Sequence, residues 1–218
     1  MDNRAIQITL REGSLSSIIE KSTGKNHLRW VLHFGVYRDE IINYPSFSEL
    51  TGHLIVTPNS VSQQGDIVVT RSSFLTTDHR LYVENILETK QNKKWIRMKM
   101  IISNLGPAIN DLWVGVYSDF NVGGTFGNDT AVFEPATYFE LDKDIAYMYE
   151  NSSIGISATR KSTRHHIGPW NSFNIATVLQ SPNDENGPIG PGDLAVGMRW
   201  DLGNLPQGNV TFIRYASL

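Results

Sequence analysis

The chain of 218 residues contains no cysteine. Disulfide bonds, zinc–thiolate centres and cysteine nucleophiles are therefore excluded. This absence does not decide the compartment, because it suits both the cytoplasm and many prokaryotic surface proteins.

Charge is also sparse, and neither sign dominates. Charged residues make up 19% of the chain, and 19 basic against 22 acidic residues give a net charge of −3. Without a stripe of Lys and Arg, nucleic acid and anionic membrane surfaces are disfavoured as partners. Hydrophobic residues make up 40% of the chain, which excludes a disordered polypeptide.

Long apolar runs and amphipathic helical segments are missing too. No run approaches the roughly 18 residues that cross a bilayer, so we predict no membrane span. The opening residues, MDNRAIQITLREGSL, lack the basic-then-apolar pattern of a signal peptide. No segment of helical length repeats its apolar residues every 3.6 positions.

Strand patterns are present throughout, most clearly in residues 95–132. Apolar side chains recur at every second position of the first half of this segment: Ile96, Met98, Met100 and Ile102. This period of two predicts a strand with one buried face. Residues 112–117 are apolar on both faces, which is typical of a strand between two layers. We expect the two strands to be joined by a short turn.

Further short strands are predicted about every ten residues, separated by turn residues. They cover residues 5–10, 15–19, 28–36, 52–57, 66–70, 74–76, 81–89, 131–139, 145–149, 154–158, 194–202 and 209–215. Residues 173–179 fit a strand or a short helix, and residues 159–170 and 181–193 are predicted as loops. The final two strands are expected to pair. The pattern predicts a single all-β domain, residues 1–218, with a large antiparallel β-sandwich.

Residues 10–28, LREGSLSSIIEKSTGKNHL, resemble the hairpin that opens the β-supersandwich region of family 38 α-mannosidases and related carbohydrate-active proteins. Glu20 stands where that family usually has Asp. The matching positions are Gly13, Leu15, Ser17, Ile18, Lys21, Thr23 and Gly24. Residues 193–218 are similar to the closing strands of non-catalytic sandwich domains in secreted enzymes.

The resemblance implies a galactose-mutarotase-like supersandwich, with an immunoglobulin-like or jelly-roll sandwich as the alternatives. It also implies an accessory region to which no catalytic residue can be transferred. We expect an extracellular or cell-surface location, with the cytoplasm left open.

A glycine-rich acidic loop follows the second central strand. Asp119, Asn121, Asn128 and Asp129 supply side-chain oxygens there. Ca²⁺ takes six to eight oxygen ligands, so this loop is a candidate calcium site, although it lacks the EF-hand spacing. The alternative is a connection whose Asp and Asn side chains bond to their own backbone.

Aromatic and basic residues suggest a sugar- or anion-binding surface. The candidates are His165, His166, Trp170 and Trp113. Aromatic rings stack on sugar faces while polar neighbours bind hydroxyl groups. Adjacent histidines on a strand point to opposite faces, so His165 and His166 make a poor joint metal site.

Catalysis would need paired groups that the sequence does not single out. Candidate carboxylates for glycoside hydrolysis are Asp119, Asp129, Glu134 and Glu140, and an epimerase would need a histidine, His79 or His165, facing Glu84 or Glu134. We assign no catalytic residue.

The leading functional hypothesis is a non-catalytic carbohydrate-associated module with a binding or architectural role, whose partners are carbohydrate or neighbouring protein subunits. The first alternative is a self-assembling subunit of an extracellular filament or surface layer, stabilised by Ca²⁺, in which the first or last strand pairs with another copy. The second is a mutarotase-like sugar epimerase.

Overall fold

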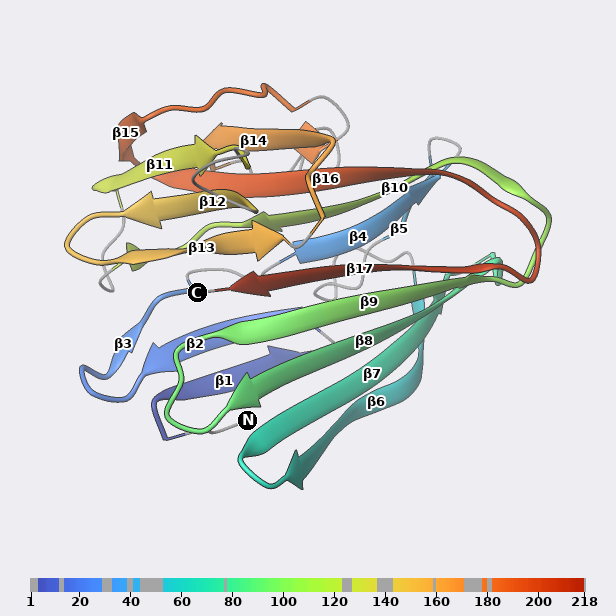
Figure 1. The fold of residues 1–218 in the computed structure, drawn as a ribbon, viewed down its shortest axis with the longest axis horizontal. Helices are drawn as coiled ribbons and strands as arrows, with labels where there is room; N and C mark the ends of the chain where they lie inside the picture. The colour runs from blue at the N-terminus through green and yellow to red at the C-terminus, as the bar shows by residue number, and fades with distance from the viewer. Residues whose placement is uncertain are drawn as a thin grey trace.

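The structure is a computed structural model that describes residues 4–11, 14–28, 33–38, 41–43, 53–76, 78–122, 127–136, 143–158, 160–170, 178–179 and 182–217. Within these residues the chain forms three antiparallel sheets (Figure 1). α-Helical backbone in this part of the chain is confined to residues 178 and 179. The prediction of an all-β fold is confirmed.

The sheets differ in size. The smallest has the order β1 (Ile6–Arg11), β2 (Ser14–Glu20), β3 (Lys25–Asn26). The second has the order β14 (Arg164–Pro169), β16 (Leu194–Leu205), β10 (Ile109–Ser118), β4 (His33–Arg38), β5 (Ile41–Asn43). The largest has the order β15 (Ile189–Gly192), β11 (Asp129–Glu134), β12 (Asp144–Tyr149), β13 (Ser153–Ala158), β17 (Val210–Ser217), β9 (Ile96–Asn104), β8 (Leu81–Lys90), β7 (Ile67–Thr76), β6 (His53–Gln64).

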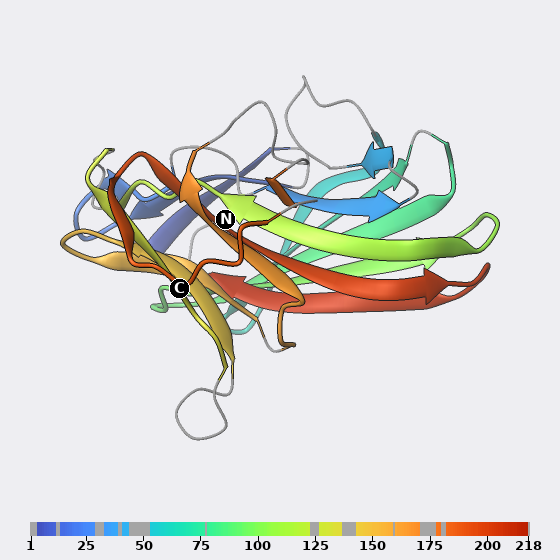
Figure 2. The same cartoon turned by 90° about the horizontal axis from the view of Figure 1, so that it is seen from above.

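The two large sheets form a sandwich around one apolar core. Alternate residues of β9 are buried in it, whereas Arg97 between them is exposed, so the predicted period of two is confirmed. Residues 112–117 of β10 are buried on both faces, also as predicted. The small sheet adds Ile8 and Leu15 to the same core. Long strands of both large sheets, among them β10 and β17, curve in the same direction (Figure 2).

The opening hairpin is confirmed by the antiparallel pairing of β1 with β2. The turn that follows closes through a hydrogen bond from Gly24 N–H to the Glu20 carbonyl oxygen, 2.8 Å. Gly24 adopts a φ of 71°, which glycine reaches without steric cost. The hydroxyl of Thr23 donates to the Glu20 carboxylate at 2.9 Å, so Glu20 supplies the acceptor at this position. Gly13 lies outside the described residues.

Two connections predicted to join neighbouring strands cross between the sheets instead. β9 belongs to the nine-stranded sheet and β10 to the five-stranded sheet, and the final strands β16 and β17 are divided in the same way. The pairing predicted for the final two strands is therefore wrong. A short turn can lead to a partner in the same sheet or to the facing layer, and local sequence does not distinguish the two.

Asn104 joins these two crossings. Its side chain is fully buried, and Nδ2 donates to the carbonyl oxygens of Pro107 at 2.9 Å and Leu205 at 2.8 Å. Its Oδ1 accepts a hydrogen bond from Gly106 N–H at 3.0 Å. One amide thus supplies three hydrogen bonds to backbone groups that a sheet ladder does not satisfy.

Boundaries differ from prediction at β6 and β7. Residues 52–57 and 66–70 were expected as strands around a loop, but β6 runs continuously through Pro58, and the predicted strand 74–76 is the end of β7. β6 is an edge strand, where a missing backbone N–H is tolerated. In the same region, the register shifts between Thr57 and Ser60.

Two predicted loops contain strands. Residues 164–169 form β14 within the predicted loop 159–170, and residues 189–192 form β15 within the predicted loop 181–193. The side chain of Asn183 bonds to both backbone groups of Ile167, and the Asp184 carboxylate accepts from His165 N–H at 2.9 Å. These contacts cover the outer edge of β14, which explains how a basic, histidine-bearing segment becomes a strand.

Other differences are smaller. The strand expected at residues 131–139 ends at Glu134. Most of the segment 173–179 lies outside the described residues. In the part of the chain that the structure describes, no helix has the length and apolar character to cross a membrane.

The structure predicts that replacing Asn104 by Ala lowers the free energy of unfolding by about 3 kcal/mol, because the fully buried side chain and its three hydrogen bonds to the backbone are lost. Urea denaturation would measure this. Asn110→Ala removes the same side chain from an exposed position six residues along and should change stability by less than about 0.5 kcal/mol. Equal effects of the two substitutions would contradict the role of Asn104.

Candidate functional site

Three of the four predicted ligand-binding residues, Trp113, His166 and Trp170, lie together on the face of the five-stranded sheet that is turned away from the main core. Trp113 and Tyr117 of β10 belong to a separate cluster with Leu179, against which Trp170 packs. Trp170 stacks on Tyr117 with 5.4 Å between ring centroids and 18° between ring planes. The ring of His166 lies 6.1 Å from the ring of Tyr117, measured between centroids.

This cluster is closely packed. Tyr117 is fully buried and Trp113 is 9% exposed. The guanidinium of Arg199 lies over the Trp113 ring at 4.1 Å. Leu179 occupies the space above Gly115, where an added Cβ would lie 2.6 Å from its Cδ1. The partly exposed Trp170 is the more accessible ring, and sugar binding at this cluster stays a prediction.

His165 points to the opposite side of β14 from His166, as expected of neighbours on a strand. Its ring stacks on Phe133 of β11, with 3.5 Å between centroids and 5° between planes. Its Nε2 lies 3.0 Å from the carbonyl oxygen of Glu185. Burial lowers the pKa of both histidines, and the neighbouring charge of His165 lowers that of His166 further.

The histidine–glutamate pairs considered for an epimerase do not converge. His165 contacts Phe133 in the sandwich, whereas Glu134 lies on the other face of β11. His79 is exposed in the turn before β8, and Glu84 pairs with Arg71 of β7 at 3.1 Å. Glu140 lies outside the described residues.

The acidic-loop candidates divide by burial. Asp119 and Asp129 are 1% and 2% exposed, Asn121 is partly buried, and Asn128 is exposed. Burial raises the pKa of Asp129 to about 7, and repulsion from Glu150 adds to this.

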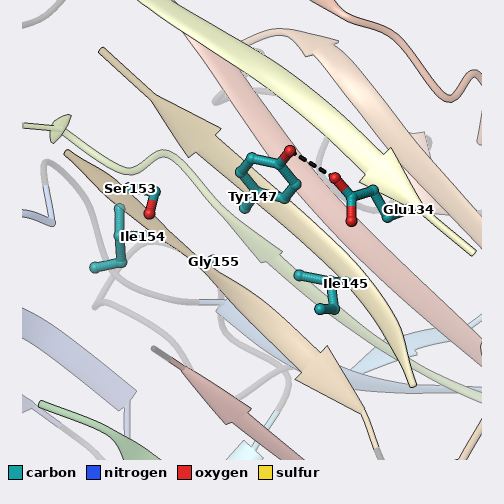
Figure 3. A pocket seen from close by; sticks show the side chains of 6 residues that line it. All are labelled: Glu134, Ile145, Tyr147, Ser153, Ile154 and Gly155. Carbon is teal, nitrogen blue, oxygen red and sulfur yellow. Dashed lines mark hydrogen bonds between the residues drawn. The ribbon is translucent and has the colours of Figure 1, made fainter. Parts of the chain in front are cut away.

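A cavity lies elsewhere, on the outer face of β11, β12 and β13 (Figure 3). It has a volume of about 220 Å³. Its lining residues are Glu134, Ile145, Tyr147, Ser153, Ile154 and Gly155. We call it the β11–β13 groove. An added Cβ at Gly155 would lie 2.5 Å from the Cβ of Tyr147, so only glycine fits beside this tyrosine.

A tyrosine–carboxylate pair is the main polar feature of the groove. The hydroxyl of Tyr147 donates to Glu134 Oε1 at 2.7 Å, and this hydrogen bond raises the pKa of Tyr147 to about 12. The ring of Tyr149, 38% exposed, lies 6.1 Å from the Tyr147 ring at an angle of 35°. The arrangement offers aromatic rings, a carboxylate and a serine hydroxyl on one surface.

Sequence reasoning weighed Glu134 only as a catalytic carboxylate and missed Tyr147. The signal was the alternation in residues 145–149, where Ile145, Tyr147 and Tyr149 occupy one face of β12. The pairing of Val132 with Tyr147 then places Glu134 diagonally across from the tyrosine. That register is a property of the folded sheet.

Comparison with protein-family models and with curated protein sequences gives no match. Solved structures are similar in fold. A bacterial glucoamylase complexed with acarbose matches 99% of this chain with a TM-score of 0.72 and 12% identity. An α-mannosidase from Enterococcus faecalis matches 100% with a TM-score of 0.54 and 11% identity. A galactose mutarotase-like protein from Lactobacillus casei matches 100% with a TM-score of 0.54 and 11% identity.

This chain covers very different shares of the three proteins. This chain spans 30% of the glucoamylase and 28% of the α-mannosidase, but 98% of the mutarotase-like protein. At such low identity the similarity concerns the fold. The chain has the galactose-mutarotase-like β-sandwich fold that its opening hairpin resembles.

The lowered histidine pKa values predict that acid destabilises the fold. Between the lowered folded pKa and the unfolded value near 6.5, the unfolded state binds more protons, so stability falls as pH drops below about 6.5. His166→Phe should reduce this fall by up to about 1.4 kcal/mol per pH unit relative to the unaltered chain. Urea denaturation between pH 7.5 and pH 5.5 measures the difference.

Asp129, whose pKa is raised to about 7, titrates in the same pH range, and its protonation favours the folded state as pH falls. The slope of unfolding free energy against pH is therefore compared between variants. His79→Asn, in an exposed turn with a φ of 60° that Asn tolerates, is the control and should leave the slope unchanged. An unchanged slope in His166→Phe would show that His166 does not contribute.

Proposed function

We propose that this chain is a non-catalytic carbohydrate-binding β-sandwich module, and that a sugar binds in the β11–β13 groove. The observation that carries the proposal is the Tyr147–Glu134 pair in a cavity on the outer face of the nine-stranded sheet.

The chemistry of the groove suits a sugar. Sugar rings present C–H groups to aromatic faces and hydroxyl groups to their surroundings. Tyr147 supplies a ring that lines the groove, and the ring of Tyr149 lies beside it, 6.1 Å away between ring centroids. The Glu134 carboxylate has a second oxygen to accept hydroxyl hydrogens, and Ser153 supplies a further hydroxyl. At about 220 Å³ the cavity is smaller than the roughly 300–1,000 Å³ of sites for drug-sized ligands, so it suits one sugar unit.

Binding is a better account of the groove than catalysis. Glycoside hydrolysis uses two carboxyl groups that flank the bond. Among the described residues that line the groove, Glu134 is the single carboxylate and no histidine is present. The pair that hydrolysis or epimerisation needs is therefore not assembled there.

The fold supports a carbohydrate-associated role, and a place beside a catalytic domain fits the small share of the glucoamylase and the α-mannosidase that this chain spans. We extend the proposal to an extracellular or cell-surface location. Because fold alone does not determine function, the proposal rests on the groove.

The test is the affinity of the purified chain for malto-, manno-, cello- and xylo-oligosaccharides, measured by calorimetry. Tyr147→Ala should weaken binding by about tenfold or more, because it removes a ring and the partner of Glu134. Glu134→Gln keeps the size of the side chain and should weaken binding several-fold.

Two controls locate the site. Tyr82→Ala removes a partly buried tyrosine from β8 of the same sheet and should leave affinity unchanged. Trp170→Ala tests the cluster on the other sheet. Loss of binding in Trp170→Ala with full binding in Tyr147→Ala would move the site to that cluster, and no binding to any sugar would remove the proposal.

Self-association through the edge strand β6 is a second candidate function. The last strand, predicted as a possible pairing edge, lies between β13 and β9, so that part of the earlier hypothesis is wrong. β6 instead forms an edge of the nine-stranded sheet, and residues 56–64 are exposed, including Val56 at 52% and Val61 at 60%. An exposed edge strand is a template for pairing with a second copy.

Sedimentation over a range of protein concentrations tests this candidate. Val61→Lys should shift the chain towards monomer, because an edge lysine opposes strand pairing. Val210→Lys, at a residue 59% exposed on the interior strand β17, should not. A chain that is monomeric at every concentration would dismiss self-association.

A further inference from the structure

The charge of the β11–β13 groove comes from one residue. Side chains of β11, β12 and β13 alternate between the core and the outer face, and the sheet register places Glu134 beside Ile145 on the outer face. Ser153 and Gly155 of β13 lie on the same face. Glu134 is the single charged side chain among the outward-facing residues of these three strands, and the others are Thr, Val, Ile, Tyr, Ser and Gly.

Among the described residues, no basic side chain pairs with this carboxylate. Further along the same face of the nine-stranded sheet, Glu88 pairs with Arg97 of the neighbouring strand at 3.6 Å. Glu134 lacks such a partner within the described ranges, and its polar contact there is with the Tyr147 hydroxyl. A partly buried carboxylate is stabilised by a positive charge beside it, so the groove favours a ligand that supplies one.

The Tyr147 hydroxyl influences which ligand groups the groove accepts. It donates its hydrogen to Glu134 Oε1 at 2.7 Å (Figure 3), so this hydrogen is not available to a ligand. The second oxygen of Glu134 can accept from a ligand. Ser153 is the other lining side chain with a hydroxyl. A ligand group rich in hydrogen-bond donors therefore suits the groove better than one rich in acceptors.

The aromatic rings favour positive charge as well. The face of an aromatic ring is negative, and it attracts ammonium groups as well as C–H groups. The ring of Tyr147 lines the groove, and that of Tyr149, 38% exposed, lies beside it. Rings and carboxylate thus act in the same direction. They attract an ammonium group and repel a carboxylate or sulfate group on a sugar.

We propose that the sugar bound in the β11–β13 groove carries a free amino group, and that its protonated nitrogen donates to the second oxygen of Glu134. This inference rests on the proposed function and narrows the ligand from sugars in general to amino sugars. Charge-assisted hydrogen bonds are roughly twice as strong as neutral ones, which favours an ammonium over a hydroxyl. Acetylation removes the charge and adds a carbonyl acceptor, for which Ser153 is the available lining hydroxyl.

The test compares three β-1,4-linked tetrasaccharides that differ at carbon 2 of each ring, where glucosamine has an amine, N-acetylglucosamine an acetamide and glucose a hydroxyl. Calorimetry is carried out at about pH 6, where a primary amine such as an α-amino group is protonated. The unaltered chain should bind the amine form about tenfold more tightly than the hydroxyl form. The acetamide form should bind no more tightly than the hydroxyl form.

Glu134→Gln should abolish the preference for the amine form, because it removes the charge and keeps the size of the side chain. Glu88→Gln is the matched control. It removes one negative charge from the same face of the same sheet and should keep the full preference. Tetralysine, which carries amines without sugar rings, should bind at least about tenfold more weakly than the amine tetrasaccharide.

The outcomes separate this inference from the proposed function. Equal affinity for the amine and hydroxyl forms, with both lost in Tyr147→Ala, would overturn the amino-sugar assignment and leave the sugar groove in place. Tetralysine binding as tight as that of the amine form would indicate a general cation site and also overturn the assignment. No binding of any saccharide would remove both proposals.

A preference for the amine form that persists in Glu134→Gln would place the amine elsewhere. If Glu134→Gln does not fold, the pH dependence of the unaltered chain decides. The preference should disappear at about pH 9, where the amine has lost its proton, and a preference that remains there would contradict an ionic contact.

Discussion

Asn104 lies where the chain crosses twice between the two large sheets, and the position of one sheet over the other depends on these crossings. β9 pairs with β17 in the larger sheet, and β10 pairs with β16 in the smaller one. The connections from β9 to β10 and from β16 to β17 therefore lie side by side, and the Asn104 amide donates to a carbonyl oxygen in each. Because the amide is buried, water cannot replace these bonds, and the two crossings are fixed as one unit.

Whether a sheet face is covered decides where a ligand can bind. The outer face of β10 and β16 is occupied by Leu179 and the stacked rings of Tyr117 and Trp170. These aromatic residues act mainly as a second, smaller core. The outer face of β11–β13 keeps Tyr147 only partly buried and Tyr149 exposed beside a carboxylate. Aromatic residues that look equivalent in the sequence thus differ in accessibility.

Local sequence patterns predicted the strands and turns that can be recognised from their own residues. The period of two in residues 96–102 and the apolar run 112–117 correspond to β9 and β10, and the hairpin at residues 10–28 was recognised from its turn residues. β14 could not be predicted, because its Arg and His residues become a strand only through pairing with β16 and contacts with Asn183 and Asp184.

The same distinction applies to the sites. Asp119 and Asp129 were selected from the sequence as oxygen ligands, but their burial depends on tertiary contacts such as the β15 pairing. The Tyr147–Glu134 pair joins residues 13 apart through the register of β11 with β12. A sequence shows which side chains lie on one face of one strand, and it does not show which strand lies beside it.

β11 positions the carboxylate of the proposed sugar groove. Glu134 ends the strand on the groove side, and its neighbour Phe133 faces the core. A one-residue slip of β11 against β12 would move Glu134 to the core face and expose Phe133 in its place. Phe133 stacks on His165 in the sandwich, and this contact opposes such a slip from the other face of the strand. The groove thus depends on a strand that is held in register by packing along its buried face.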